Sequence, residues 1–283
     1  MKKTVVKVVG VALAATCVLG ATACGGDKLE VGKEFLAAAT QLDALTKLDK
    51  GEADVAIIDS VMAGYYTSTG DYANKMEMVD GLIFAEESYG IAGKKENEAL
   101  VSKINEALLA IRTTDYAEIA AKYGLTDSIA LTAETVNPYA DATDSSWDEV
   151  VSSGKIVIGY TVFAPIAMDE NTGFDIELAK KAVAYLNTTY SQNIEVEFLI
   201  IDWNSKETLL ENGSIDLIWN GMTITPDRSA QMCVSVPYLY NMQVAVVTKA
   251  DADKYTTKES MADAIMTAES GSAGETVIVG AKE

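Results

Sequence analysis

The stretch 213-GSIDLIWNGMTITPDRSAQMCVSVPY-238 is the part of the sequence that specifies the fold most closely. An apolar run typical of a buried strand leads through an Asn-Gly pair to Thr225-Pro226-Asp227, where a helix is predicted to begin. Threonine suits the N-cap, proline the first helical position, and aspartate the positive end of the helix dipole. Arg228 follows in the first turn, where the dipole does not favour a cation. It therefore either pairs with a surface carboxylate such as Asp227 or faces an anion from elsewhere.

Strand-like runs and helical spacing alternate through the rest of the chain. Helical periodicity is clearest in 174-FDIELAKKAVAYL-186, where Phe174, Leu178 and Ala182 share one face. Strands that alternate with helices predict α/β layers with largely parallel sheets. Six segments are predicted as strands: KIVIGY (155–160), IEVEFLIID (194–202), SIDLIWN (214–220), QVAVVTK (243–249), ADVAIID (53–59) and YGIAGKK (89–95).

The composition excludes several classes of function. The chain has 283 residues, a formal net charge of −20 and no histidine. The lack of histidine excludes imidazole general bases, His-containing triads and most zinc sites. The negative charge makes nucleic acid and anionic lipid poor partners for the body of the protein. Of the three cysteines only Cys233 lies beyond residue 24, so we predict no disulfide framework and a buried, apolar role for Cys233.

Residues 1–23 have the pattern of a signal peptide: a basic segment, an apolar segment and the small residues Ala21-Thr22-Ala23. Cleavage before Cys24 resembles the processing of bacterial lipoproteins, in which the new N-terminal cysteine is lipidated and anchors the protein to a membrane. We therefore expect an extracytoplasmic, lipid-anchored protein, although Ala21 departs from the usual lipoprotein pattern. Ordinary secretion or release into the periplasm is the alternative.

Three motifs of the opening stretch carry a family resemblance: Gly213-Ser214-Ile215-Asp216, Thr225-Pro226-Asp227-Arg228 and Ser235-Val236-Pro237-Tyr238. Together with 159-GYTVFAPIAMDENTGFDIELAKK-181 they resemble the family 3 extracytoplasmic solute-binding proteins, the polar amino-acid receptors of ABC importers. The resemblance implies a bilobal periplasmic-binding-protein type II fold, with two α/β lobes joined by a two-segment hinge. It also implies a free amino acid and the membrane subunits of an ABC transporter as partners, and no cofactor or metal.

The order of the resembling segments is unusual. Residues 42–66, 89–95 and 103–111 look like the C-terminal half of the family, yet they come first. The Gly-Ser-Ala-Gly turn at 271–274 opens a helix whose natural continuation is found near residue 31. We therefore predict a circular permutation of the family, with a fusion of two gene halves as the alternative.

Permutation changes the expected division into lobes. Residues 28–85 plus 249–283 would form a discontinuous lobe, and residues 86–248 a continuous one. The hinge would consist of segments near 85–89 and 247–249. The Thr-, Asp-, Ala- and Ser-rich segment 127–146 would be an exposed linker inside the continuous lobe.

The resemblance further implies a site for the two charged groups of an amino acid. Arg228 would bind the carboxylate, with Thr223 and the backbone at Gly221 completing that subsite. Asp59 matches the ammonium-binding aspartate of the family. Its position also suits the N-cap of the helix that follows, and the two roles are compatible.

Other site residues are implied on both lobes. The backbone amides of Ser272 and Ala273 would face the carboxylate from across the cleft. Phe163 and Trp203 would flank the ligand, with Tyr160 near its side chain.

Glu269 occupies a position at which family members contact the ligand side chain, and an acidic residue there suggests a cationic or amide side chain.

Three rival hypotheses remain. A bilobal enzyme of the cyclohexadienyl or arogenate dehydratase type would use Glu269 or Asp59 as a general acid. A sensor module that does not serve transport would bind an amino acid for signalling, and a nonfunctional fusion would bind none. We favour a binding protein without catalytic residues.

Overall fold

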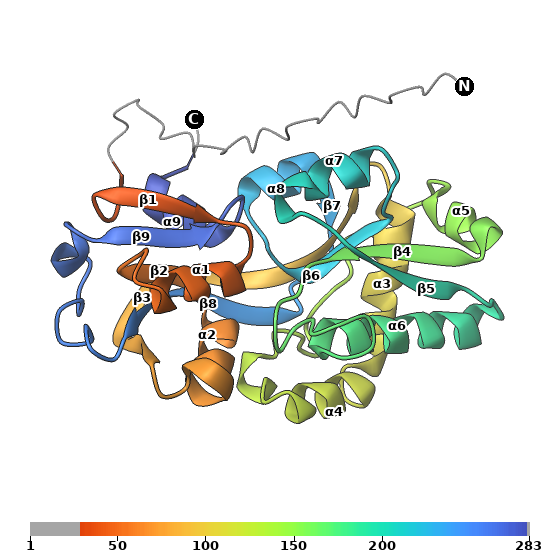
Figure 1. Cartoon of the computed structure of the whole chain (residues 1–283). Helices are drawn as coiled ribbons and strands as arrows, with labels where there is room; N and C mark the ends of the chain where they lie inside the picture. Colours follow the sequence, from red (N-terminus) through yellow and green to blue (C-terminus); the bar gives the residue numbers. More distant parts are fainter. Residues whose placement is uncertain (1–28, 282–283) are drawn as a thin grey trace, which may run out of the picture.

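The computed structural model describes residues 29–281, and these residues form two α/β lobes that lie side by side (Figure 1). The predicted signal peptide and Cys24 lie outside the described residues. We call the lobe that contains β1, β2, β9, α1, α2 and α9 the terminal lobe, and the lobe that contains β4 to β7 and α3 to α8 the central lobe. The strands are β1 Glu34–Ala38, β2 Val55–Asp59, β3 Met76–Lys94, β4 Lys155–Tyr160, β5 Glu195–Ile200, β6 Leu217–Thr223, β7 Met232–Val234, β8 Leu239–Thr248 and β9 Ile265–Glu269. The α-helices are α1 Gln41–Asp49, α2 Ser60–Ser68, α3 Glu98–Ile111, α4 Asp115–Lys122, α5 Ser146–Ser153, α6 Phe174–Tyr190, α7 Lys206–Glu211, α8 Pro226–Gln231 and α9 Ala273–Val279.

Two long antiparallel strands, β3 and β8, connect the lobes (Figure 1). The sheet runs in the order β1-β9-β2-β8-β3-β6-β4-β5, with β7 beside β3. The end of β8 pairs with β2 in the terminal lobe, whereas the end of β3 pairs with β6 and β7 in the central lobe. Each strand therefore belongs to both lobes, and a change in the angle between the lobes must bend them.

The pairing of β8 places one boundary between the lobes earlier in the chain than the sequence suggested. Gln243 already pairs with Asp59, and Val246 with Ala56, so the end of β8 belongs to the sheet of the terminal lobe. The expected crossing at 247–249 is therefore wrong, and this strand crosses at its beginning, where it pairs with residues 85–89 of β3. The reason is that one unbroken strand serves both lobes, a property that its apolar pattern does not reveal.

Strand directions are more mixed than the sequence suggested. The pairs β1–β9, β2–β9, β4–β5 and β4–β6 are parallel, as expected for strands linked through helices. Every pair that involves β3 or β8 is antiparallel. The prediction of largely parallel sheets thus holds within each lobe and fails at the two connecting strands.

The structural elements that local sequence signals predict in the central lobe are confirmed. β4 has the predicted bounds, and α6 begins at Phe174 as its periodicity indicated. Thr225 is the N-cap of α8, accepting a hydrogen bond from the Arg228 backbone N–H at 3.1 Å, with Pro226 at the first position. Cys233 is buried. Among the described residues, no helix is long and apolar enough to cross a membrane.

The predicted linker 127–146 is irregular between Ser128 and Ser146, and most of its residues are exposed. It nevertheless supplies the cap of α3. The N-cap residue of that helix, Asn97, makes no capping bond through its side chain. Instead the Ala99 N–H donates to Asp144 Oδ2 at 2.7 Å, and the Leu100 N–H donates to Ser146 Oγ at 2.9 Å. Two of the free N–H groups at the start of α3 are thus satisfied from a distant part of the chain.

The first and last described segments lie together in the terminal lobe. The backbone N–H of Glu30 donates to the Ile278 carbonyl at 2.8 Å, and the Val31 N–H donates to the same oxygen at 3.3 Å. β1 pairs in parallel with β9, from Glu34 opposite Ile265 to Ala38 opposite Glu269. In space, β9, α9 and β1 therefore follow one another as a parallel strand–helix–strand unit.

Replacing Asp144 with alanine should lower the free energy of unfolding by about 1 kcal/mol, because α3 loses an acceptor for its first turn. Urea unfolding followed by circular dichroism measures the change. Asp141→Ala is the matched control, since Asp141 is an exposed aspartate of the same segment. Equal stability of the two variants would show that the contact does not cap the helix.

Candidate functional site

A cavity lies between the two lobes, and residues of both lobes line it. The central lobe contributes Thr161, Phe163, Trp203, Asn220, Gly221, Thr223 and Arg228, and the terminal lobe contributes Gln41, Asp59, Glu269, Ser272 and Ala273. We call this the inter-lobe cavity. All but one of the ligand-site residues predicted within the described part of the chain line it. Their sequence positions are far apart, and the fold brings them together.

Tyr160 is the exception. Its side chain is buried with Ala167 and Ile176, and its ring lies 6.0 Å from that of Phe198. The expectation that it lies near the ligand side chain is therefore wrong. Thr161 lines the cavity instead, because successive residues of an extended chain point to opposite sides.

Arg228 projects from the first turn of α8 and meets backbone carbonyl groups of both lobes. Nη1 donates to the Thr223 carbonyl at 2.8 Å, and Nη2 donates to the Gly271 carbonyl of the terminal lobe at 3.1 Å. Among the described residues, no carboxylate oxygen lies within 4 Å of its nitrogens. Burial lowers its pKa, while the charges of Glu207, Glu87 and Asp59 act in the opposite direction. A guanidinium in this state is well suited to a carboxylate from solution.

Gly221 lies at the centre of this wall. Its φ of +61° favours glycine, and a Cβ there would come within 2.7 Å of the Phe163 ring. Its backbone N–H donates to the buried carboxylate of Asp175 at 2.8 Å, and the Tyr238 hydroxyl donates to the same oxygen at 2.7 Å. Burial raises the pKa of Asp175 to about 7. Asp175 therefore holds the backbone of the cavity wall from behind.

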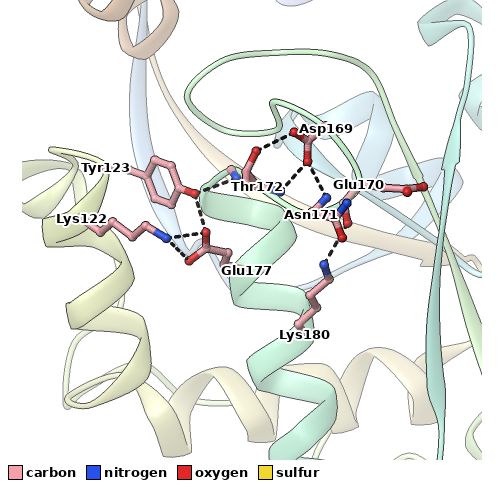
Figure 2. Close-up of polar contacts among 9 residues, drawn as sticks. Lys122, Tyr123, Asp169, Glu170, Asn171, Thr172, Glu177 and Lys180 are labelled. Atoms are coloured by element: carbon pink, nitrogen blue, oxygen red, sulfur yellow. Dashed lines mark hydrogen bonds and ion pairs between the residues drawn. The ribbon is translucent and has the colours of Figure 1, made fainter.

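A network of polar contacts holds the turn before α6, the helix that carries Asp175 (Figure 2). Asp169 accepts hydrogen bonds from the backbone N–H groups of Asn171 and Thr172, at 2.6 and 2.8 Å. Tyr123 accepts from the Gly173 N–H at 2.8 Å and donates to Glu177 at 2.6 Å. This network joins α4 to the beginning of α6 and so fixes the first turn of that helix.

Asp59 lies at the end of β2 and is buried in the terminal-lobe wall. Its carboxylate accepts hydrogen bonds from the side-chain amides of Gln41, Asn241 and Gln243. It occupies the N-cap position of α2 but makes no capping bond through its side chain, so that alternative role is not fulfilled. Burial, and then the negative charge of Glu87, raise its pKa well above the usual range.

Glu269 lies at the end of β9 with 5% of its surface exposed, and its Oε1 atom has no hydrogen-bond partner. Burial raises its pKa to about 8; Lys206 opposes this increase and Asp202 adds to it. The carboxyl is thus mostly protonated at neutral pH. In that form it is both a donor and an acceptor, a property that suits an uncharged polar group.

Lys206 is a buried cation that sequence reasoning missed. Its side-chain nitrogen donates to the Trp203 carbonyl at 3.1 Å, lies 4.7 Å from the centre of the Trp203 ring and pairs with Glu207 at 3.0 Å. It also approaches the Gly271 carbonyl, at 3.5 Å. Burial lowers its pKa. No local signal marks it, because its burial arises from the packing of α7 against β3 and β6. Gln41, Thr161 and Asn220, which line the cavity, were also missed, because tertiary packing places them there.

The glycine turn completes the terminal-lobe wall. Ser272 caps α9 by accepting from the Glu275 N–H at 3.2 Å, and Glu275 accepts from the Gly271 N–H at 2.5 Å. A Cβ at Gly274 would lie 2.7 Å from the Ile57 carbonyl, so only glycine allows this close approach to β2. The helix start predicted at this turn is confirmed.

The raised pKa values predict how stability depends on pH. An acid whose pKa is higher in the folded state binds its proton more tightly there, so stability falls as pH rises from the unfolded to the folded pKa. For Asp175 and Glu269 this window runs from about pH 4 to about pH 8. Above this pH window the stabilising contribution of each carboxyl is lost completely. For Asp175 that contribution to the free energy of unfolding is about 4 kcal/mol, at about 1.4 kcal/mol per pKa unit.

Urea unfolding of the ligand-free protein at a series of pH values measures this slope. Asp175→Asn, which keeps an acceptor for Gly221 and Tyr238, should flatten the curve between about pH 4 and pH 7. Stability that increases with pH in this window for the unaltered protein would contradict the assignment.

Comparison with known proteins identifies the region that contains most of this site. Residues 156–270 match the family described as bacterial extracellular solute-binding proteins, family 3. The chain is 28% identical to the probable ABC transporter extracellular-binding protein YckB of Bacillus subtilis, over 40% of each chain. It is 33% identical to the arginine-binding extracellular protein ArtP of the same organism, over 35% of this chain and 37% of that protein.

A solved structure of an ABC uptake transporter substrate-binding protein from Streptococcus pneumoniae, with bound histidine, is 35% identical. The match has a TM-score of 0.26 and covers 31% of this chain and 35% of that one. The chain thus aligns with about 40% or less of the length of each of these relatives. Residues 156–270, which carry the three motifs and the arginine of the inter-lobe cavity, are thus similar to the bacterial extracellular solute-binding proteins of family 3.

Proposed function

We propose that this protein is an extracytoplasmic receptor that captures a free polar amino acid in the inter-lobe cavity and delivers it to an ABC importer. The observation that carries the proposal is the placement of opposite charges on opposite walls. Arg228 of the central lobe and Asp59 of the terminal lobe line the same cavity. A free α-amino acid is a zwitterion, so it needs one cationic and one anionic partner at the same time.

The carboxylate subsite centres on Arg228. Within the described part of the chain, its guanidinium donates to two carbonyl oxygens, and a carboxylate is a stronger acceptor for its planar fork. Thr223 and Gly221 adjoin it on the same lobe, and the amides of Ser272 and Ala273 face it from the other lobe. A ligand bound here contacts both lobes and so favours the closed arrangement, in which Arg228 already reaches Gly271.

The ammonium subsite is Asp59, and the side chain of the ligand extends toward Glu269 between Phe163 and Trp203. Glu269 offers a protonated carboxyl near neutral pH, and it ionises when a cation approaches. The subsite therefore accepts an amide or a cationic group. The matched relatives named for arginine and found with histidine are consistent with a polar side chain.

We further propose that the chain is anchored outside the cytoplasm by a lipid on Cys24. This rests on the sequence pattern of residues 1–24, with the basic and apolar segments followed by the cysteine. Family 3 proteins are described as extracellular, which agrees with this location.

The order of the elements supports circular permutation of the family. β9, α9 and β1 form a continuous strand–helix–strand unit in space although α9 and β1 lie at opposite ends of the described chain. The hydrogen bonds of Glu30 and Val31 to Ile278 join these ends. The segment 127–146 then connects the regions that in the family would be the two ends.

A thermal-shift screen of the twenty common amino acids tests the function. An amino acid present at about one hundred times its dissociation constant should stabilise the folded state by about 2.7 kcal/mol. Arg228→Ala should abolish the stabilisation because the carboxylate loses its charged partner. The control is Arg112→Ala, since Arg112 is the only other arginine of the chain and lies at the end of α3, away from the cavity. An unchanged shift in Arg228→Ala would refute the assigned subsite.

A rearranged gene tests the permutation. Residues 137–281 followed by residues 29–136, joined through a short glycine linker, should give a protein that unfolds cooperatively and shows the same amino-acid preference. The new ends fall beside Val136, which is 77% exposed, and Asp144 stays in place to cap α3. Failure of this arrangement to fold would favour the fusion hypothesis.

A further inference from the structure

A second carboxylate lies beside Asp59, at the place where the connecting strands pass between the lobes. Glu87 belongs to β3, and Asn241 and Gln243 belong to β8. The Asn241 side-chain amide donates to both carboxylates, with 2.5 Å to Glu87 Oε1. The Gln243 amide does the same, with 2.7 Å to Asp59 Oδ1 and 2.6 Å to Glu87 Oε1. The two acids thus share their donors and form one group.

This group has no cation of its own. Within residues 29–281, no lysine or arginine nitrogen lies within 4 Å of Asp59 or Glu87. The hydroxyl of Tyr89 is fully buried beside Asp59, and burial followed by the charges of both acids raises its pKa. Two ionised carboxylates in such a place repel each other, and neutral amides do not compensate their charge.

We propose that Asp59 and Glu87 together form the ammonium subsite, which holds one proton in the ligand-free protein and releases it when the ammonium group of an amino acid binds. The inference rests on the proposed function. The exchange balances: one R–NH₃⁺ enters the subsite, one H⁺ leaves the carboxyl pair for solvent, and the net charge of the subsite stays the same. Glu87 is a positioning residue, since it acts through Asp59 and the shared amides.

The surroundings of the pair favour a shared proton. Close like charges raise the pKa of one member of a carboxyl pair, and burial acts in the same direction. The raised pKa of Asp59 has these two causes, burial first and Glu87 second.

The other groups that face the pair do not replace the proton. Gln41 of α1 and the two amides of β8 are neutral, and Tyr89 of β3 is un-ionised. Across the cavity, Arg228 of α8 donates to carbonyl groups and makes no ion pair with either acid. On the same lobe as Asp59, Glu269 of β9 is itself an acid of raised pKa.

Proton release can be measured directly by isothermal titration calorimetry in buffers of different ionisation enthalpy. The probes are L-glutamine and L-arginine, because neither side chain titrates between about pH 6 and pH 8. L-glutamine decides the test, since the cationic side chain of L-arginine would also ionise Glu269. Binding should release protons, and the dissociation constant should rise by up to about tenfold for each unit that the pH falls below the midpoint. In Glu87→Gln the midpoint should move to lower pH by about one unit or more, because the like charge is lost while an acceptor for the amides remains.

Glu86→Gln is the matched control, since Glu86 is the exposed neighbour of Glu87 on the same strand. It should release protons as the unaltered protein does. Binding without proton release, or an unchanged midpoint in Glu87→Gln, would overturn the proposal while leaving the receptor function intact.

A ligand-independent measurement covers the case in which neither amino acid binds. Carboxyl ¹³C NMR of the ligand-free protein should show Asp59 titrating well above the usual range of aspartate and moving down in Glu87→Gln. An Asp59 titration that is the same in both proteins would refute the shared proton whatever the ligand is.

Discussion

The guanidinium of Arg228 is held by the carbonyl of Thr223 on its own lobe and by the carbonyl of Gly271 on the other. This contact closes the inter-lobe cavity and leaves a buried cation with neutral partners, which is a costly state for a charge unless a better acceptor arrives. The other features of the site support this position of Arg228. The positive φ of Gly221 within β6, the support from Asp175 and the N-cap at Thr225 all serve to hold α8 and its arginine against the cavity.

In the described part of the chain, the opposite wall of the cavity carries negative charge without a cation to pair with it. Asp59 and Glu87 are held by amides of the connecting strand β8 and have no cation among the described residues. Among the described residues, the positive charge on one wall and the negative charge on the other are not in direct contact, since Arg228 forms no ion pair with Asp59 or Glu87. A zwitterion placed between them satisfies both walls at once. Since β3 and β8 carry the acidic wall and also join the lobes, occupation of the site and the angle between the lobes are physically linked.

Much of the central lobe could be predicted because its signals are local. The N-cap at Thr225, the beginning of α6 and the strand β4 depend on short stretches of sequence. Arg228, Thr223 and Gly221, which the family motifs singled out, line one cavity. What could not be predicted depends on pairing between distant segments. Tyr160 was assigned to the wrong side of β4, and the crossing point of β8 was placed too late. Lys206, Asn241 and Gln243 gain their roles only from tertiary packing, which no local pattern reveals.

A crystal structure of the protein with a bound amino acid would test the central claim most directly. We predict that the ligand carboxylate lies on the guanidinium of Arg228 in place of a carbonyl group, with the ammonium on Asp59 and the side chain toward Glu269. An amino acid bound elsewhere, or one bound in the inter-lobe cavity without contact to Arg228, would contradict it.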